Sequence, residues 1–196
     1  MSKGRLEAFS DGVFAILITI MVLELHAPEG ATFGDLKPLL PKFISYILSF
    51  VYVGIYWNNH HHMLQSVKHV NGKVLWSNML LLFCISLIPF VTAWMGENHF
   101  SASPVALYGV VLLLCALSYP VLIHYLIQLH GKDSLLGKSI GGDTKGKVSI
   151  LIYVAGIALT FLNPWFGFGL YIVVACIWFI PDKRIEKRIQ DNSTAE

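Results

Sequence analysis

Charged and hydrogen-bonding side chains gather near the start of the chain, directly before an apolar run. Arg5, Glu7, Ser10 and Asp11 stand close together, and the apolar run from Gly12 to Leu25 follows at once. The chemistry that a guanidinium, a hydroxyl and two carboxylates offer here is hydrogen bonding and ion pairing. Such a cluster would fix the tilt and rotation of the helix that carries it.

Helical geometry separates the members of this cluster. On a helix, Arg5 and Gly12 share one side, whereas Ser10 and Asp11 point elsewhere. We therefore expect Arg5 and Asp11 not to be each other's sole partners, and each to reach another helix. Two later stretches, YWNNHHHMLQ and VLWSNMLLLF, contain the candidate partners His61 and Asn78.

Three consecutive histidines, His60, His61 and His62, suggest a metal site at first sight. Consecutive helical residues point about 100° apart, so the three rings cannot face one ion without unwinding the helix. No HExxH pattern or pair of aspartates accompanies them, as a metal-dependent hydrolase would require. We therefore expect no metal site and no enzymatic activity, and a pH-sensing role stays open because histidine titrates near neutrality.

The composition indicates the elements that must position these residues. Of 196 residues 55% are hydrophobic and 13% are charged, about half the charged fraction of a soluble domain. Long apolar runs account for the excess, which indicates an all-α polytopic membrane protein. Six helices are expected, over Ala8–Leu25, Leu40–His60, Val74–Trp94, Pro104–Leu129, Val148–Leu162 and Trp165–Ile180. They would form one membrane domain, residues 1–181, followed by a short charged tail, residues 182–196.

The basic residues predict which side of the membrane the termini occupy. Six crossings place both termini on the same side. All but two of the 14 Lys and Arg residues then fall on that side, the exceptions being Lys37 and Lys42. The positive-inside rule therefore predicts cytoplasmic N and C termini in a multi-pass protein of the cell membrane.

The first apolar helix carries a regular stripe. Ile16, Thr19, Ile20 and Leu23 recur at steps of three and four residues and so share one face. This is the spacing of a heptad seam, which packs helices around a shared axis. Thr19 also puts a hydroxyl near mid-membrane, where polar groups usually face protein or water. The alternative is that the stripe is ordinary core packing within one chain.

The stretch RLEAFSD, followed by GVFAI, resembles the Arg-x-x-x-Phe-Ser-Asp signature of the transmembrane-protein-175 family. This family comprises endolysosomal potassium channels and their bacterial homologues. The resemblance continues in YWNNHH after the second helix and in WSN and IPF on the third. It covers the first half of the chain, and the second half only in topology. It adds Phe9, His60 and Trp76 to the residues expected in the polar cluster at the cytoplasmic end.

The resemblance implies a homotetramer whose four first helices line a central path for K⁺. It places an apolar constriction at Ile16 and Leu23, with a layer of Thr19 and Ile20 between them. The chain contains no TVGYG filter and no re-entrant loop, so the apolar neck would set selectivity by removing water from K⁺ more readily than from Na⁺. Glu24 would either form an acidic outer ring that attracts cations or merely reach water.

The expected function is therefore a potassium-preferring cation channel. The alternative is a small secondary transporter, which should show charged residues at mid-membrane or broken helices in matching halves. The sequence predicts neither feature. The expected partners are further copies of the chain, the lipid bilayer and permeating monovalent cations; no cofactor, metal or nucleic acid is expected.

Overall fold

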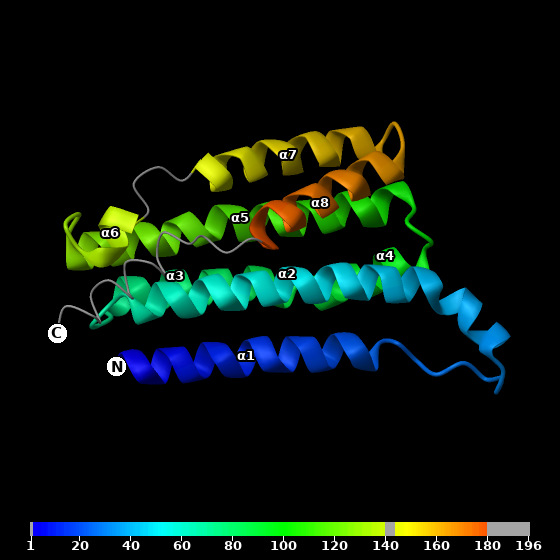
Figure 1. Cartoon of the computed structure of the whole chain (residues 1–196), viewed down its shortest axis with the longest axis horizontal. Coiled ribbons are helices and arrows are strands. Elements are labelled where there is room, and N and C mark those ends of the chain that lie inside the picture. Colours follow the sequence, from blue (N-terminus) through cyan, green and yellow to red (C-terminus); the bar gives the residue numbers. More distant parts are fainter. Residues whose placement is uncertain (1, 140–143, 180–196) are drawn as a thin grey trace.

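The computed structural model describes residues 2–139 and 144–179, and the regular elements in these ranges are helices. They run back and forth along one long axis and form an elongated bundle (Figure 1). A short 3₁₀ helix, η1 (Phe33–Leu39), precedes the second long helix. In chain order the α-helices are α1 (Lys3–Leu23), α2 (Leu40–Gln65), α3 (Gly72–Ser86), α4 (Ile88–Glu97), α5 (Ala102–His130), α6 (Leu135–Ser139), α7 (Thr144–Thr160) and α8 (Pro164–Phe179).

Several of these helices have the length and composition of membrane spans. The four that suffice by length and apolarity are Lys3–Leu23, Phe33–Gln65, Gly72–Glu97 and Ala102–His130. Helix α8 is apolar but has only 16 residues. The prediction of an all-helical protein with several membrane-spanning segments is therefore confirmed. The charged tail expected at residues 182–196 lies outside the described residues.

The third span differs from its prediction. The sequence predicts one helix over Val74–Trp94, and the structure divides this segment into α3 and α4 at Leu87. Pro89 has no N–H to donate to the carbonyl of Ile85, so it cannot continue α3 without loss. It stands instead in the first turn of α4, where the N–H has no helical partner in any case. The span expected over Val74–Trp94 is therefore made of two helices, with the boundary beside Pro89.

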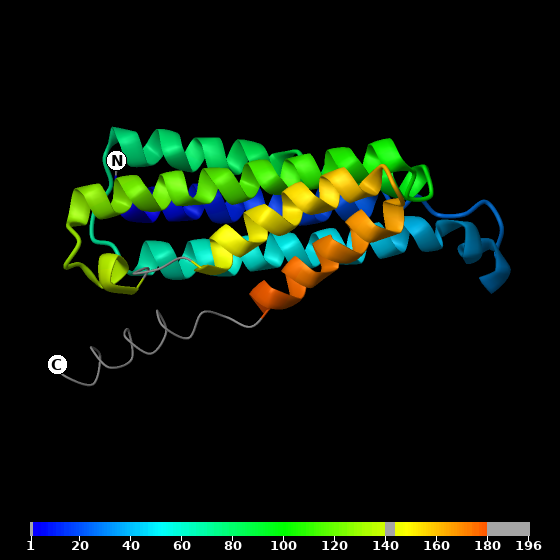
Figure 2. The ribbon, with the colours of Figure 1, turned by 90° about the horizontal axis from the view of Figure 1, so that it is seen from above.

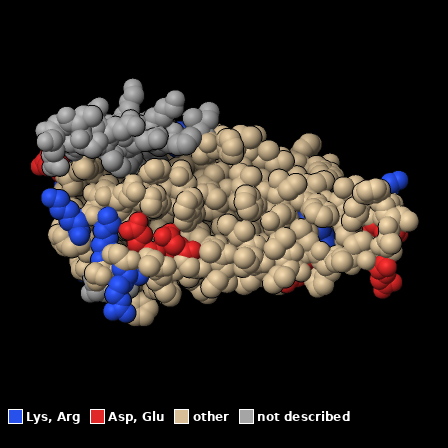
Figure 3. Space-filling view, turned by 60° about the horizontal axis from the view of Figure 1, so that its bottom comes forward, with Lys and Arg blue, Asp and Glu red and all other residues tan. Residues whose placement is uncertain are grey.

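The two ends of the bundle differ in charge. The N-terminus, the α2–α3 connection and the last turn of α5 lie at one end, called here the N-terminal end (Figures 1 and 2). Figure 3 shows Lys and Arg side chains gathered at this end, with a long surface almost free of charge beside them. At the opposite end Lys42 pairs with Glu97, with 2.9 Å between Nζ and Oε1, and joins α2 to α4.

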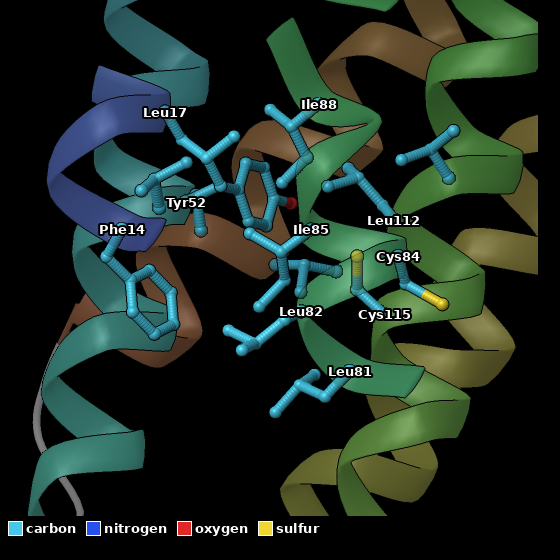
Figure 4. Close-up of a cluster of buried hydrophobic side chains, with 14 of the residues drawn as sticks. Phe14, Leu17, Tyr52, Leu81, Leu82, Cys84, Ile85, Ile88, Leu112 and Cys115 are labelled. Atoms are coloured by element: carbon cyan, nitrogen blue, oxygen red, sulfur yellow. The ribbon is translucent and has the colours of Figure 1, made fainter. Parts of the chain in front are cut away.

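The core lies between α1, α2 and the α3–α5 layer. Figure 4 shows Phe14 and Leu17 pointing from α1 into a cluster that contains Tyr52, Leu82 and Ile85. Phe14 is only 1% exposed. Inside a bilayer such contacts stabilise the bundle through van der Waals packing, because lipid tails are as apolar as the side chains.

Hydroxyl groups join the helices inside this core. Ser49 on α2 lies 2.6 Å from the Thr92 hydroxyl on α4 and 3.0 Å from the Tyr108 hydroxyl on α5. Tyr153 on α7 donates to the hydroxyl of Tyr52 on α2 over 3.3 Å. Interhelical hydrogen bonds of this kind hold membrane helices together where hydrophobic burial gives little.

The last residue of α5 fastens the loop between α2 and α3. Nε2 of His130 accepts from the backbone N–H groups of Lys68 and His69, at 3.2 and 3.4 Å. Nδ1 of the same ring lies 3.0 Å from the carbonyl of Leu126. A ring that accepts at Nε2 and donates at Nδ1 is neutral, so this contact requires an unprotonated imidazole.

Candidate functional site

Helix α1 has one buried and one exposed face. Its buried residues recur at steps of three and four: Leu6, Ser10, Phe14, Leu17 and Met21. On the far side Ile16 is 57% and Leu23 73% exposed, and Thr19 and Ile20 are exposed with them. The four residues predicted to form a constriction thus lie on the surface of the single chain. Ordinary core packing within one chain, the alternative reading of this stripe, is thereby corrected.

Thr19 is the polar group of this exposed face. Its hydroxyl donates to the carbonyl of Ile16 over 2.8 Å. Because the donor is already used within the helix, the oxygen lone pairs remain free to accept from water or to face a cation. Glu24 caps the end of α1 and is also exposed.

A buried hydrogen-bonded chain fixes the N-terminal half of α1. The Ser10 hydroxyl donates to the carbonyl of Leu6 over 2.9 Å and accepts from Nδ2 of Asn78 on α3 over 3.1 Å. Oδ1 of Asn78 lies 2.7 Å from Nε2 of His60 on α2. Asn78 therefore accepts from a His60 ring protonated at Nε2, and one chain joins α1, α2 and α3. Ser10, His60 and Asn78 are all at most 1% exposed.

Two carboxylates of α1 reach α2 at the edge of this chain. Nε1 of Trp57 donates to Oδ1 of Asp11 over 3.0 Å. Nδ1 of His61 lies 3.4 Å from Oε1 of Glu7. The Trp57 and His61 rings stack on one another, with centroids 5.9 Å apart. These contacts, with the buried chain, fix the rotation of α1 against α2.

The structure brings five of the eight residues predicted for the polar cluster into these contacts: Ser10, Asp11, His60, His61 and Asn78. Arg5, Phe9 and Trp76 are exposed, and none of them makes a polar side-chain contact with these five within the described residues. Arg5 and Phe9 lie on the side of α1 that carries Ile16, which turns them away from α2 and α3.

The sequence reasoning did not assign Trp57 to the cluster, and it named Glu7 there without a partner. A signal was present in the spacing. Glu7 and Asp11 are four residues apart, as are Trp57 and His61, so each pair shares a helix face. When two helices run antiparallel, two residues four apart on one helix can face two residues four apart on the other, as Asp11 and Glu7 face Trp57 and His61.

No group of three or more His, Cys, Asp or Glu side chains within residues 2–139 and 144–179 could hold a metal ion. His60 and His61 lie in different surroundings, one buried against Asn78 and the other beside Glu7. The arrangement therefore offers a firmly held helix whose outward face, from Gly12 to Leu23, is apolar apart from the Thr19 hydroxyl.

The sequence is similar to those of known ion channels. The family model for the endosomal/lysosomal potassium channel TMEM175 matches residues 5–89, which include α1 and the helices that anchor it. A potassium channel of Chryseobacterium sp. (strain P1-3) is 54% identical over 192 residues, covering 98% of this chain and 100% of the relative. A potassium channel of Chamaesiphon minutus is 32% identical over 187 residues, covering 88% and 91% of the two chains.

A solved structure has the same fold. The crystal structure of a lysosomal potassium-selective channel TMEM175 homolog from Chamaesiphon minutus superposes with a TM-score of 0.78 at 28% identity, covering 92% of this chain and 97% of that one. The human endosomal/lysosomal proton channel TMEM175 is 30% identical over 116 residues, which is 53% of this chain and 23% of the human protein. Through its near-complete match to a relative at 54% identity, this chain belongs to the TMEM175 family of ion channels.

Proposed function

We propose that the chain is one subunit of a potassium-preferring cation channel, a homotetramer in which the exposed face of each α1 lines the path of the ion. The observation that carries this proposal is the contrast between the two faces of α1. One face is packed and hydrogen-bonded into the subunit, and the other presents Ile16, Thr19 and Leu23 outward. A helix held so firmly in one rotation is suited to placing specific side chains at an axis.

The constriction follows from the spacing along α1. Ile16 and Leu23 are seven residues apart, which is about 10 Å along a helix. Rings of these side chains form a narrow apolar neck that opens and closes by wetting and dewetting. Thr19 and Ile20 form the layer between them, where four hydroxyls offer oxygen to an ion that has lost part of its water.

The polar cluster positions this neck. A helix displaced by one residue turns by about 100°, which would carry Thr19 away from the axis. Asn78, His60 and Trp57 resist that rotation, because each contacts a side chain of α1 directly or through one intermediate. Glu24, at the opposite end of α1, forms an acidic ring that raises the local cation concentration.

The membrane arrangement follows from the ends of the bundle. We propose six crossings, with α3 and α4 together as one, α7 and α8 as the last two, and residues 1–181 as a single domain of the cell membrane. The basic N-terminal end lies in the cytoplasm, as the positive-inside rule favours. Short helices such as α8 are tolerated where they lie against protein.

The names of the relatives favour potassium over protons as the main permeant ion. The relatives that match this chain over almost its whole length are named potassium channels. The name proton channel belongs to animal proteins of which this chain covers about a quarter. No cofactor takes part in the proposed mechanism.

The test is ion flux through purified protein in planar bilayers, with K⁺ on one side and Na⁺ on the other. The reversal potential should favour K⁺, and the current should need no coupled ion. Ile16→Asn and Leu23→Asn should keep the neck wet, raise the current and bring the permeability ratio toward one. The matched control is Val154→Asn, an equally exposed apolar position on α7. Saturable uptake driven by a coupled ion would establish the transporter instead, and unchanged currents in both α1 variants would remove these residues from the path.

A further inference from the structure

Two exposed apolar stripes lie on either side of α1. The α2 stripe consists of Phe43, Ile47, Phe50, Gly54 and Trp57, at alternating steps of four and three residues; Gly54 is partly buried and the other four are exposed. The α3–α4 stripe consists of Trp76, Leu80, Phe83 and Phe90. Figure 2 shows α1 between α2 and α3, so the stripes flank the exposed face of α1 on opposite sides.

Contacts with α1 give the depth of each stripe along the bundle. On antiparallel α2, Trp57 lies beside Asp11, which places Gly54 at the level of Phe14. On α3, which runs parallel to α1, Asn78 lies beside Ser10. Phe83 comes five residues after Asn78, so it lies at about the level of residue 15 of α1, one residue beyond Phe14. Gly54 and Phe83 thus stand at nearly the same depth on opposite flanks.

The shapes at this depth are complementary. Nothing lies within 4 Å of the position that a Cβ on Gly54 would take, so the glycine leaves a notch in the α2 stripe. Phe83 projects from the other stripe, 62% exposed.

A second pair of complementary features lies one to two turns further along. A groove of about 330 Å³ opens between α1 and α4, lined by Leu17, Ile20, Ser86, Pro89 and Phe90 among others. By the same count, Phe50 and Ile47 on the α2 stripe lie at the level of residues 18 and 21 of α1, which is the level of this groove. Both of these side chains are exposed.

We propose that the α2 stripe of one copy packs against the α3–α4 stripe of the next copy, with Phe83 in the Gly54 notch and Phe50 and Ile47 in the groove beside Ile20. The inference rests on the proposed assembly around α1. In a ring built by rotation every copy presents two different faces, and a rotation about an axis along the bundle keeps matching features at equal depth. The outer surface of α7, with Val148, Leu151 and Val154 exposed, has the plain aliphatic character that suits lipid.

This interface completes the ion path. The groove beside Ile20 opens next to the face of α1 that carries the constriction, and side chains from the neighbouring α2 close it. At each contact between neighbouring copies, the wall of the neck is therefore formed by α1 of one copy and by the α2 stripe of the other.

The test is disulfide formation between copies in protein carrying Cys176→Ser, which removes the one exposed native thiol among the described residues. Gly54→Cys combined with Phe83→Cys should give a covalent ladder up to the full oligomer on mild oxidation, because paired Cα atoms must approach to about 7 Å or less. The matched control, Leu151→Cys with Phe83→Cys, should stay unlinked. No ladder for the first pair, or an equal ladder for the control, would overturn the inference.

A second variant needs no cross-link. Gly54→Trp fills the notch and should raise the dissociated fraction in detergent on the order of tenfold, the effect of a moderately overpacked contact. Gly169→Trp is its control, since Gly169 on α8 also has open space at its Cβ position. If the unsubstituted protein has the mass of a tetramer and conducts, yet Gly54→Trp assembles like its control, only this interface fails. A monomeric unsubstituted protein would defeat the proposed channel itself.

Discussion

Replacing Asn78 by leucine tests whether the buried chain holds α1. Asn78 is fully buried and joins Ser10 to His60. Leucine has nearly the same size but removes both hydrogen bonds. Ser10 keeps its own bond to the carbonyl of Leu6, so its loss is small, about 0.6 kcal/mol for a typical interhelical bond in a membrane protein.

The larger cost falls on His60. Its Nδ1 already lacks a partner within the described residues, and the substitution also leaves its Nε2–H without an acceptor. A buried donor without a partner costs about 1–3 kcal/mol. Asn78→Leu should therefore lower the free energy of unfolding by about 2–4 kcal/mol.

The assay is reversible unfolding in mixed micelles, carried out as a double-mutant cycle with His60→Leu. The double variant removes the unpaired donor along with its former acceptor, so it should be more stable than the sum of the two single changes predicts, by about 1 kcal/mol or more. Potassium flux of Asn78→Leu should fall with assembly. Additive costs, or a cost below about 0.5 kcal/mol for Asn78→Leu, would refute the role given to this chain.

Two further predictions concern other parts of the bundle. Gly109→Ala should lower the free energy of unfolding by about 1–3 kcal/mol, because a Cβ there would overlap the hydroxyl of Tyr171. Gly12→Ala, with open space at its Cβ, should be at least as stable as the parent protein, and equal stability of the two variants would contradict this. Nε2 of His130 accepts from the two loop amides of Lys68 and His69, so His130→Ala should reduce the hydrogen-exchange protection of those amides. His130→Gln, whose side-chain carbonyl can still accept, should keep more of that protection, and equal protection in the two variants would contradict this.

The outer residues of the predicted cluster show where sequence reasoning was limited. Helical periodicity separates Arg5 from Asp11, and the topology brings Asn78 to the end of the bundle that carries Ser10. Periodicity does not say which neighbour lies on which side of α1, so it could not exclude Arg5, Phe9 and Trp76 from the buried contacts. The role of these three in an assembled channel stays a prediction.

The sequence by itself determined the all-helical membrane class, the set of residues that share one face of α1 and, through the RLEAFSD signature, the family that the comparisons confirm. These features depend on composition and local spacing, which a helix translates directly into length and faces. Only the tertiary structure decided that this face is exposed, that Trp57 binds Asp11 and that Gly54 lies level with Phe83. Those relations depend on the register between helices far apart in the chain, which packing in three dimensions sets and no local pattern encodes.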